Sequence, residues 1–343
     1  MAGDTVLVTG GSGFIAGWCI RRLLEAGCVV RTTVRTLARE AEVRGAIGGA
    51  ALDPARLSFH AADLTGDAGW LEAAQGARFA LHLASPFPLA APRDESELII
   101  PARDGALRLL RAAKAAGVER VVLTSSMAAV AYGAQPQRTA PFTEVDWTDV
   151  NGPGCSAYIK SKTIAERAAW DWRAQEGGAL ELATVNPSAV MGPILGPDLS
   201  TSVEVIRMML SGALPAIPRV GFSVVDVRDV AELHYLAMTQ PQAAGERFLA
   251  AGPFVWFEEV AAILREGLGP KARRVPKSRF PDFVVRVGGL FDGTLRTIES
   301  ELNQFRPVSS QKAETVLGWS PRSNAQAILA SAESLFAAGL VRV

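Results

Sequence analysis

The first half of the chain alternates between short β-rich hydrophobic runs and longer stretches in which apolar residues recur at helical spacing. A first strand at residues 6–9 leads through a glycine-rich turn into a helical stretch that reaches about Ala26. The other β-rich runs predict strands at residues 29–34, 57–61, 79–84, 120–124 and 182–185. The helical spacing predicts helices at residues 94–116 and 156–176, with a short one at 70–71 and a polar loop from Arg35. Strands that alternate with helices over roughly 190 residues predict an α/β fold with a doubly wound parallel sheet.

The pattern changes after Asn186-Pro187, where proline and glycine become frequent and strands become fewer. Residues 224–227 resemble a late strand and residues 228–238 a helix, so we expect the chain to return to the sheet there. Residues 256–343 are mostly helical, with proline and glycine breaks.

These changes predict two lobes. The Rossmann sheet domain would comprise residues 1–187, with residues 222–250 returning to it. A smaller, discontinuous and mostly helical lobe would comprise residues 188–221 and 251–343. The cleft between two such lobes is the default place for a small-molecule site.

The glycine-rich turn has the composition of a phosphate cradle, with the spacing G-x-x-G-x-x-A from Gly10 to Ala16. Gly10 can adopt a tight turn, Gly13 lets a ligand approach the backbone, and Ala16 lets the helix lie close to the strand. The helix start offers backbone N–H groups to an anion. A glycine-rich turn alone would also fit an ordinary loop, but its place between a strand and a helix favours a dinucleotide. The expected contacts are Gly10, Ser12, Gly13, Phe14 and Ile15.

Composition excludes several classes of function. The chain is 49% hydrophobic and 20% charged, with 35 basic and 35 acidic residues, so no global field attracts nucleic acid or an anionic membrane. The N-terminus has no signal-peptide pattern, and no apolar run reaches the ~18 residues of a spanning helix. We therefore expect a cytoplasmic protein, either a monomer or a homodimer. Its cysteines and histidines lack metal-ligand spacing and predict reduced thiols and no metal site: Cys19, Cys28, Cys155, His60, His82 and His234.

Tyr158 and Lys162 stand four residues apart on a predicted helix and so share one face. A nearby ammonium favours the phenolate and is expected to lower the pKa of Tyr158. Ser126, at the end of a predicted strand, supplies a hydroxyl that can hold a substrate oxygen beside the phenol. Tyr-x-x-x-Lys also occurs as an ordinary surface pair. The glycine turn and Ser126 are what favour a catalytic interpretation of this pair.

The end of the second strand indicates which dinucleotide is used. NAD-binding members of this fold place an acidic residue there to accept the ribose hydroxyls. This chain has Val34 followed by Arg35, whose guanidinium suits a 2′-phosphate. The pattern favours NADP(H), with an exposed loop arginine as the alternative.

Residues 9–16, 124–126 and 158–170 together resemble the extended short-chain dehydrogenase/reductase superfamily. More narrowly, the chain resembles its dihydroflavonol reductase-like branch of aldehyde and ketone reductases. Residues 225–231 and 317–321 resemble the late motifs of that branch. The likeness runs over nearly the whole chain.

The resemblance implies an NADPH-dependent oxidoreductase in which Ser126, Tyr158 and Lys162 are catalytic. Tyr158 would give a proton to the carbonyl oxygen, and Lys162 would also bind the nicotinamide ribose. The resemblance further implies cofactor contacts at Asp63 and Leu64 near the adenine, Ala84 and Ser85 near the ribose, and Pro187 and Ser188 near the nicotinamide. Residues 1–187 would then be the NADP-binding domain and the second lobe the substrate-binding one.

One departure from the family pattern concerns the substrate. Cinnamoyl-CoA reductases carry Asn-Trp-Tyr-Cys-Tyr-x-x-x-Lys, whereas residues 153–158 read Pro-Gly-Cys-Ser-Ala-Tyr, which argues against a CoA thioester. The substrate is expected to be a small, hydrophobic carbonyl compound. Candidate pocket residues, each of which also fits a core position, are Phe87, Met127, Val190, Met191, Ile217 and Phe222.

Two other functions share some of these features. A nucleotide-sugar epimerase or dehydratase has the same cradle and Tyr/Lys pair, but Val34-Arg35 and the apolar second lobe point away from NAD and a sugar diphosphate. A non-catalytic NADP-binding regulatory protein would not need Ser126, Tyr158 and Lys162 together.

Overall fold

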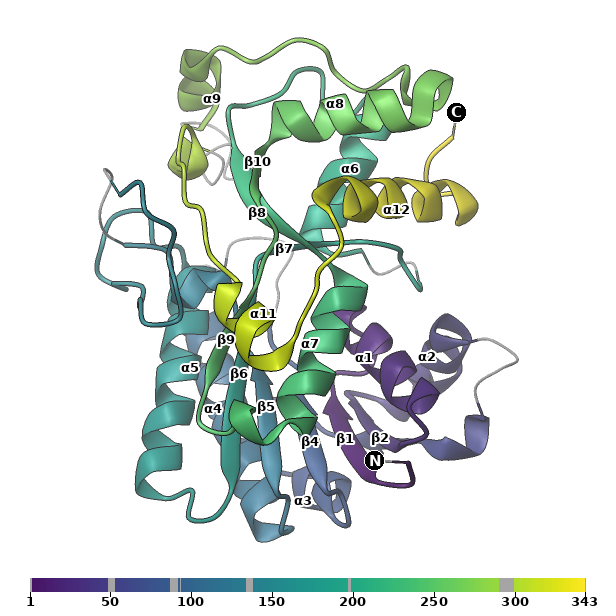
Figure 1. The fold of residues 1–343 in the computed structure, drawn as a ribbon, viewed down its shortest axis with the longest axis vertical. Helices are drawn as coiled ribbons and strands as arrows, with labels where there is room; N and C mark the ends of the chain where they lie inside the picture. Colours follow the sequence, from purple (N-terminus) through teal and green to yellow (C-terminus); the bar gives the residue numbers. More distant parts are fainter. Residues whose placement is uncertain are drawn as a thin grey trace.

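A seven-stranded sheet forms the centre of the larger lobe (Figure 1). The computed structural model describes residues 2–48, 53–86, 92, 94–133, 138–196, 199–289 and 299–342. The sheet has the order β3-β2-β1-β4-β5-β6-β9, and every pairing in it is parallel. Its strands are β1 (Thr5–Thr9), β2 (Val29–Val34), β3 (Leu57–Ala61), β4 (Phe79–His82), β5 (Arg120–Thr124), β6 (Glu181–Pro187) and β9 (Arg247–Ala250). This doubly wound sheet confirms the predicted fold class.

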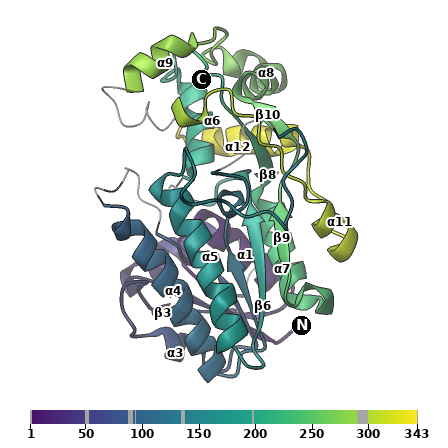
Figure 2. The same cartoon turned by 90° about the vertical axis from the view of Figure 1, so that its left-hand side faces the viewer.

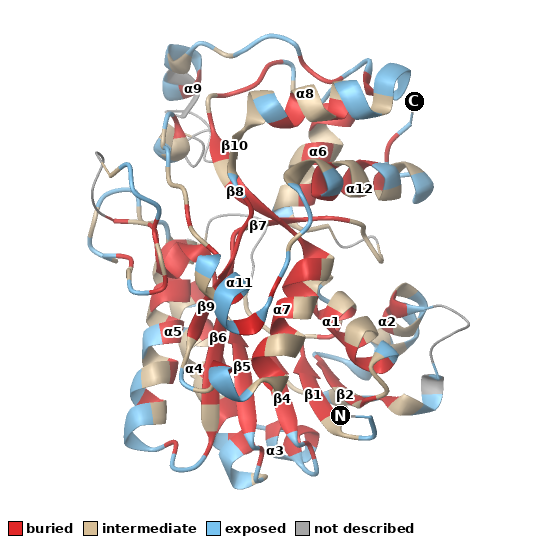
Figure 3. Cartoon of the chain, in the orientation of Figure 1, coloured by how far each residue is buried: buried red, intermediate tan, exposed pale blue. Residues whose placement is uncertain are grey.

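Helices cover both faces of this sheet. One layer contains α1 (Phe14–Glu25), α2 (Glu40–Ile47) and α7 (Val227–Thr239), and the other contains α3 (Trp70–Ala74), α4 (Ser96–Ala115) and α5 (Ala157–Gln175). In Figure 2, α4 and α5 lie side by side in front of the strands. The strands are buried along most of their length (Figure 3). Successive side chains alternate between the two layers, so that Val6 and Val8 join one core and Leu7 the other.

The smaller lobe is built around a three-stranded sheet with the order β10-β8-β7. Its strands are β7 (Ala189–Met191), β8 (Gly221–Asp226) and β10 (Phe254–Trp256), and its main helices are α6 (Thr201–Ser211), α8 (Phe257–Leu268), α9 (Asp282–Gly289) and α12 (Asn324–Ala337). α6, α8 and α12 share a hydrophobic core (Figure 1). The remaining short elements are α11 (Gln311–Leu317) and the 3₁₀ turns Leu37–Arg39, Pro54–Arg56, Met127–Ala129, Pro241–Ala243 and Gly269–Ala272.

The strand predicted at residues 224–227 does not return to the central sheet. It is part of β8, which pairs with β7 and β10 in the smaller lobe. The return instead runs through α7, which packs on α1, and through β9, which pairs with β6. The position of β9 was not apparent from the sequence, because its four residues carry no alternation that sets them apart from their surroundings.

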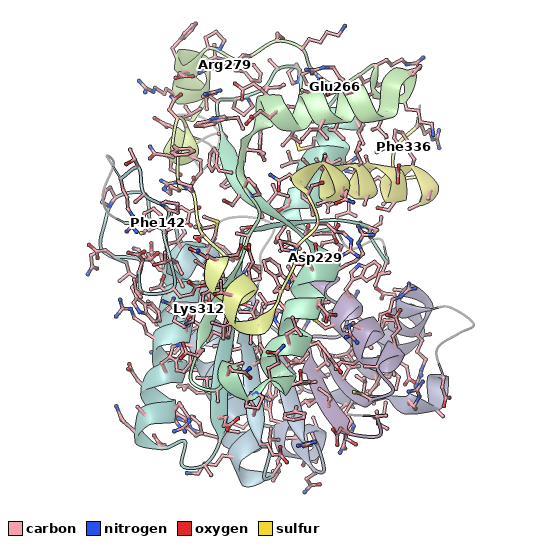
Figure 4. The ribbon with its side chains drawn as sticks, in the orientation of Figure 1. Phe142, Asp229, Glu266, Arg279, Lys312 and Phe336 are labelled. Carbon is pink, nitrogen blue, oxygen red and sulfur yellow. The ribbon has the colours of Figure 1, made fainter. Side chains whose placement is uncertain are left out.

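The two late sequence motifs contact each other where the lobes join. The indole N–H of Trp319 donates to the backbone oxygen of Asp229 (2.8 Å), and the backbone N–H of Arg322 donates to the Asp229 carboxylate (2.6 Å). Figure 4 shows Asp229 near the start of α7, below the helices of the smaller lobe. The segment that leads into α12 is therefore fastened to the larger lobe.

Within the described parts of the chain, no helix combines the length and the apolarity that crossing a lipid bilayer requires.

Candidate active site

The glycine-rich turn leaves β1 and opens α1 at the carboxyl edge of the sheet. Gly10 has a φ of +71°, a backbone conformation that residues with a side chain rarely adopt. A Cβ there would also lie only 2.9 Å from the Cα of Ala84, so there is no space for a side chain. Gly11 is required for a different reason, because a Cβ there would lie 2.2 Å from Oγ1 of Thr32 on the neighbouring strand. Sequence reasoning missed this role of Gly11. The turn is closed by the N–H of Gly13, which donates to the Gly10 carbonyl (2.8 Å).

The start of α1 has the features of an anion site. Gly13 is its N-cap residue and provides no side-chain cap, and the first turn has no acidic residue. Among the residues that the structure describes, none accepts a hydrogen bond from the backbone N–H of Phe14 or Ile15. Gly13 is itself exposed. This uncapped helix start fits the pyrophosphate of a dinucleotide.

Ser126 and Tyr158 are brought together although they lie on different elements. Ser126 follows β5 and caps the 3₁₀ turn Met127–Ala129, its Oγ accepting the N–H of Ala128 (3.1 Å). Tyr158 lies in the first turn of α5, which the hydroxyl of Ser156 caps. The two hydroxyls are joined by a hydrogen bond.

Burial determines the protonation of Tyr158. It raises the pKa of the Tyr158 hydroxyl above its usual value, while the hydrogen bond from Ser126 acts in the opposite direction. The expected lowering of this pKa by Lys162 is therefore not seen, because desolvation of the phenolate dominates. Tyr158 is a neutral phenol at neutral pH, which is the form that can donate a proton.

Lys162 lies one turn after Tyr158 on α5 and is 9% exposed. Burial lowers the pKa of the Lys162 ammonium to about 8, and the negative charge of Glu166 opposes this shift. Lys162 therefore loses its proton only slightly above neutral pH.

The end of β4 is held by Thr9. The Thr9 hydroxyl oxygen accepts the N–H groups of Leu83 (3.1 Å) and Ala84 (3.0 Å), and it lies 2.9 Å from Nδ1 of His82. Burial and the charge of Lys162 lower the pKa of His82 to about 3, so the imidazole is neutral. These contacts fix Ala84 beside Gly10, with Ser85 next along the chain, at the strand end where the resemblance expects the cofactor ribose.

Arg35 is exposed directly after β2. Hydrogen bonds from the hydroxyl and the N–H of Thr65 (2.6 and 2.8 Å) lower the pKa of the Asp63 carboxylate. The charge of Arg35 contributes to the same shift. Asp63 and Arg35 thus lie at neighbouring strand ends. Leu64 is adjacent and packs against Gly105 of α4.

A second arginine reaches the glycine turn. Nη1 of Arg39 donates to Oγ of Ser12 (3.0 Å), and the same guanidinium binds Glu42 (Nη2 to Oε1, 2.5 Å). The sequence pattern predicts a polar loop here, whereas the segment contains a 3₁₀ turn and α2. The signal that could have identified Arg39 is its spacing, because it follows Arg35 by four residues in the same polar segment.

Pro187 ends β6, and Ser188 connects it to β7. The N–H of Ser188 donates to the Ala250 carbonyl (3.0 Å), but its buried hydroxyl has no hydrogen-bond partner among the described residues. A buried hydroxyl without a partner is costly, so this position fits a polar ligand group such as the nicotinamide amide.

The candidate pocket residues do not converge on one wall. Met127 and Val190 belong to different buried clusters, Met191 and Ile217 lie in the core of the smaller lobe, and Phe222 is partly buried elsewhere in that lobe. Phe87 lies outside the described residues. A hollow of about 450 Å³ does open beside the start of α5, lined by residues that include Cys155, Ser156 and Lys160.

Comparison with known proteins gives a consistent result. Residues 6–251 match the NAD dependent epimerase/dehydratase family. Cinnamoyl-CoA reductase CAD2 of Medicago truncatula is 38% identical over 270 residues, which cover 77% of this chain and 81% of that protein. Dihydroflavonol 4-reductase of Zea mays is 32% identical over 273 residues, with coverages of 76% and 74%.

The solved structures include the yeast methylglyoxal/isovaleraldehyde reductase Gre2 complexed with NADPH. It superposes with a TM-score of 0.81 at 26% identity and covers 98% of this chain and 100% of its own. The similarity therefore extends through both lobes.

Proposed function

Because this chain belongs to the NAD dependent epimerase/dehydratase family and its relatives there include NADPH-dependent reductases, we propose that it reduces aldehydes or ketones with NADPH. The observation that carries the proposal is the hydrogen-bonded pair of Ser126 and Tyr158, one helical turn from the buried Lys162. The reaction is reversible, so the same site would oxidise the alcohol.

The residues of this site divide the work of carbonyl reduction. NADPH supplies a hydride when it is bound. Ser126 holds the carbonyl oxygen, and Tyr158, a neutral phenol, donates a proton to that oxygen as negative charge develops on it. The Lys162 ammonium stabilises the phenolate that Tyr158 becomes and donates to the ribose. Ser188, whose buried hydroxyl has no partner among the described residues, would hold the amide end of the cofactor.

The cofactor contacts follow the carboxyl edge of the sheet. The start of α1, with Gly13, would bind the pyrophosphate, and Arg35 and Arg39 would bind the 2′-phosphate. Asp63 and Leu64 would lie by the adenine, and Ala84 and Ser85 by the ribose. The predicted division into an NADP-binding domain and a substrate-binding lobe belongs to this proposal, as do a cytoplasmic location and a monomeric or homodimeric state.

The substrate proposed is a small hydrophobic aldehyde or ketone. Residues 153–158 lack the signature of cinnamoyl-CoA reductases around the tyrosine. The decisive experiment is a screen of aldehydes, ketones and acyl-CoA thioesters that follows NADPH absorbance. Reduction of thioesters but not of free carbonyls would overturn this choice, and NAD-dependent conversion of a nucleotide sugar would establish the epimerase or dehydratase alternative. Tight NADPH binding without turnover of any compound would favour a regulatory protein.

The two adjacent serines provide a test of the catalytic assignment. Ser126→Ala is expected to lower kcat about 100-fold, the effect typical of losing one donor to a developing oxyanion. Ser125→Ala is expected to lower it less, because the Ser125 hydroxyl donates to Glu166 (2.5 Å) rather than to Tyr158. Steady-state kinetics of both folded variants measure the order, and the reverse order would mean that Ser125 is the catalytic serine.

Cofactor choice provides a second test. Arg35→Ala is expected to raise the KM for NADPH by roughly 10- to 150-fold, the value of one charge-assisted contact, with little change for NADH. Arg21→Ala is the matched control, because Arg21 is an exposed arginine paired with Glu25 away from the turn. Equal use of NADH and NADPH by the wild-type protein would contradict the assignment.

A further inference from the structure

Glu166 is a buried carboxylate that the reaction described above does not use. It is 1% exposed and lies on α5, one turn after Lys162. Its Oε2 accepts hydrogen bonds from Ser125 (2.5 Å) and from Nδ2 of Asn186 (2.7 Å). Its Oε1 accepts them from Nε of Arg247 (2.7 Å) and from Thr184 (3.1 Å). These four donors satisfy both oxygens of the buried carboxylate, which favours its ionised form.

These donors come from different parts of the central sheet. Ser125 follows β5, Thr184 and Asn186 lie on β6, and Arg247 lies on β9. Three neighbouring strands and α5 are therefore joined at one carboxylate. Any movement of Glu166 would be transmitted to the strand end that carries Ser126.

Arg247 is the charged partner of Glu166. Its guanidinium also donates from Nη1 to the backbone oxygens of Glu144 (2.5 Å) and Asp146 (3.0 Å). Its Cζ lies 3.7 Å from the centre of the Trp147 ring. The ion pair is almost completely removed from solvent, with side-chain exposures of 10% for Arg247 and 0% for Glu166. Buried ion pairs of this kind seldom add stability over apolar residues, which directs attention to another role.

Two connections lead from Glu166 to the catalytic residues. The first is Asn186, whose Nδ2 donates both to Glu166 and to the backbone oxygen of Ser126 (3.2 Å). The second is its place on α5, four residues after Lys162, where two buried side chains on one helix face allow the carboxylate charge to act on the ammonium. We propose that Glu166 is a positioning residue of the reductase site, which places a buried negative charge one helical turn from Lys162 and, through Asn186, holds Ser126 in place. This inference rests on the proposed function.

Among the titratable and charged groups around Lys162, Glu166 is the one whose negative charge favours the ammonium. Tyr158 and Glu166 flank it on α5, neutral His82 lies on β4, and Arg247 stands behind Glu166 on β9. Burial lowers the pKa of Lys162, and Glu166 is the group whose charge raises it again. Without that charge, Lys162 would lose its proton at a lower pH.

The central experiment is Glu166→Gln, which keeps the shape of the side chain and removes its charge. We expect the basic limb of the kcat–pH profile for aldehyde reduction to move to lower pH by about 1 unit, the lower end of the effect of a neighbouring opposite charge. The pH dependence of NADPH affinity, followed by fluorescence, should move in the same direction. Unmoved limbs in both measurements would overturn the electrostatic part, even if kcat were lower.

Two matched variants separate charge from structure. Thr184→Val removes one donor from the same carboxylate but keeps its charge, so the basic limb should stay at its wild-type pH. Asn186→Ala should lower kcat without moving the limb, because it breaks the link to Ser126 and leaves the charge of Glu166 in place. A wild-type kcat in Asn186→Ala would overturn the positioning of Ser126.

Two further controls address the possible outcomes that Glu166→Gln does not fold and that the proposed function is wrong. If Glu166→Gln does not fold because Arg247 is left unpaired, the double variant Glu166→Gln with Arg247→Met removes both charges, and its basic limb should move in the same direction by a smaller amount. If the wild-type protein binds NADPH but reduces no carbonyl compound, the proposed function fails. The pH dependence of NADPH affinity then still decides whether Glu166 sets the charge of Lys162.

Discussion

Tyr158→Phe is expected to lower kcat for carbonyl reduction by ~100- to 10,000-fold, the usual contribution of a general acid. The phenylalanine ring keeps the packing at the start of α5, and only the proton donor is lost. NADPH should therefore bind with nearly unchanged affinity. Stopped-flow or steady-state reduction of an aldehyde, together with a fluorescence titration of NADPH, measures both quantities.

The chain offers a control for this variant. Tyr235→Phe removes a phenol on α7, where the ring packs against the guanidinium of Arg22 (3.8 Å) and not against the proposed site. Its kcat should be close to that of the wild-type protein. Near-normal turnover by Tyr158→Phe would exclude Tyr158 as the proton donor, whatever the control shows.

Lys162→Met is expected to affect both kcat and cofactor affinity. Loss of a charge-assisted contact with the ribose should raise the Kd for NADPH by roughly 10- to 150-fold. The loss in kcat should exceed this, because the phenolate formed at Tyr158 also loses its neighbouring cation. Methionine suits the apolar surroundings of this buried position, so a thermal melt should show a folded protein.

The same residue predicts a pH dependence in the wild-type protein. Because burial lowers the pKa of Lys162 to about 8, the ammonium is present below this pH and is lost as the pH rises through it. Activity and NADPH affinity should both fall above about pH 8. Lys162→Met should show no such transition in NADPH affinity, and a transition that persisted in this variant would belong to another group.

The sequence predicted the parts of the structure that depend on local pattern. The strands from β1 to β6 were placed within a few residues, because buried parallel strands are short apolar runs between turn signals. The positions of Ser126 after a strand and of Tyr158 and Lys162 on one helix were predicted because strand end and helix register are local properties. The helix α2 was missed, since its charged residues resemble a loop, and the strand predicted to end at Ala84 ends at His82.

The contacts around Glu166 could not be predicted in this way. Its partner Arg247 is separated from it by 81 residues, which include three strands of two different sheets. Neither residue differs in the sequence from an exposed charge on a helix or a strand. Only the parallel order β5-β6-β9, which no local pattern specifies, brings these side chains together.

The late position of β9 in the chain also affects how the protein is made. A ribosome adds roughly 5–20 residues per second, so the 81 residues from Glu166 to Arg247 take on the order of 4–16 seconds. During this time α5 and six strands of the central sheet have left the ribosome without the cation that compensates the Glu166 charge. The nascent chain can offer this carboxylate the neutral donors Ser125, Thr184 and Asn186, but its charge has no cationic partner unless it stays in water or is protonated. Final packing of α5 against the sheet is therefore expected to wait for β9, which is synthesised after β7, α6 and β8 of the smaller lobe.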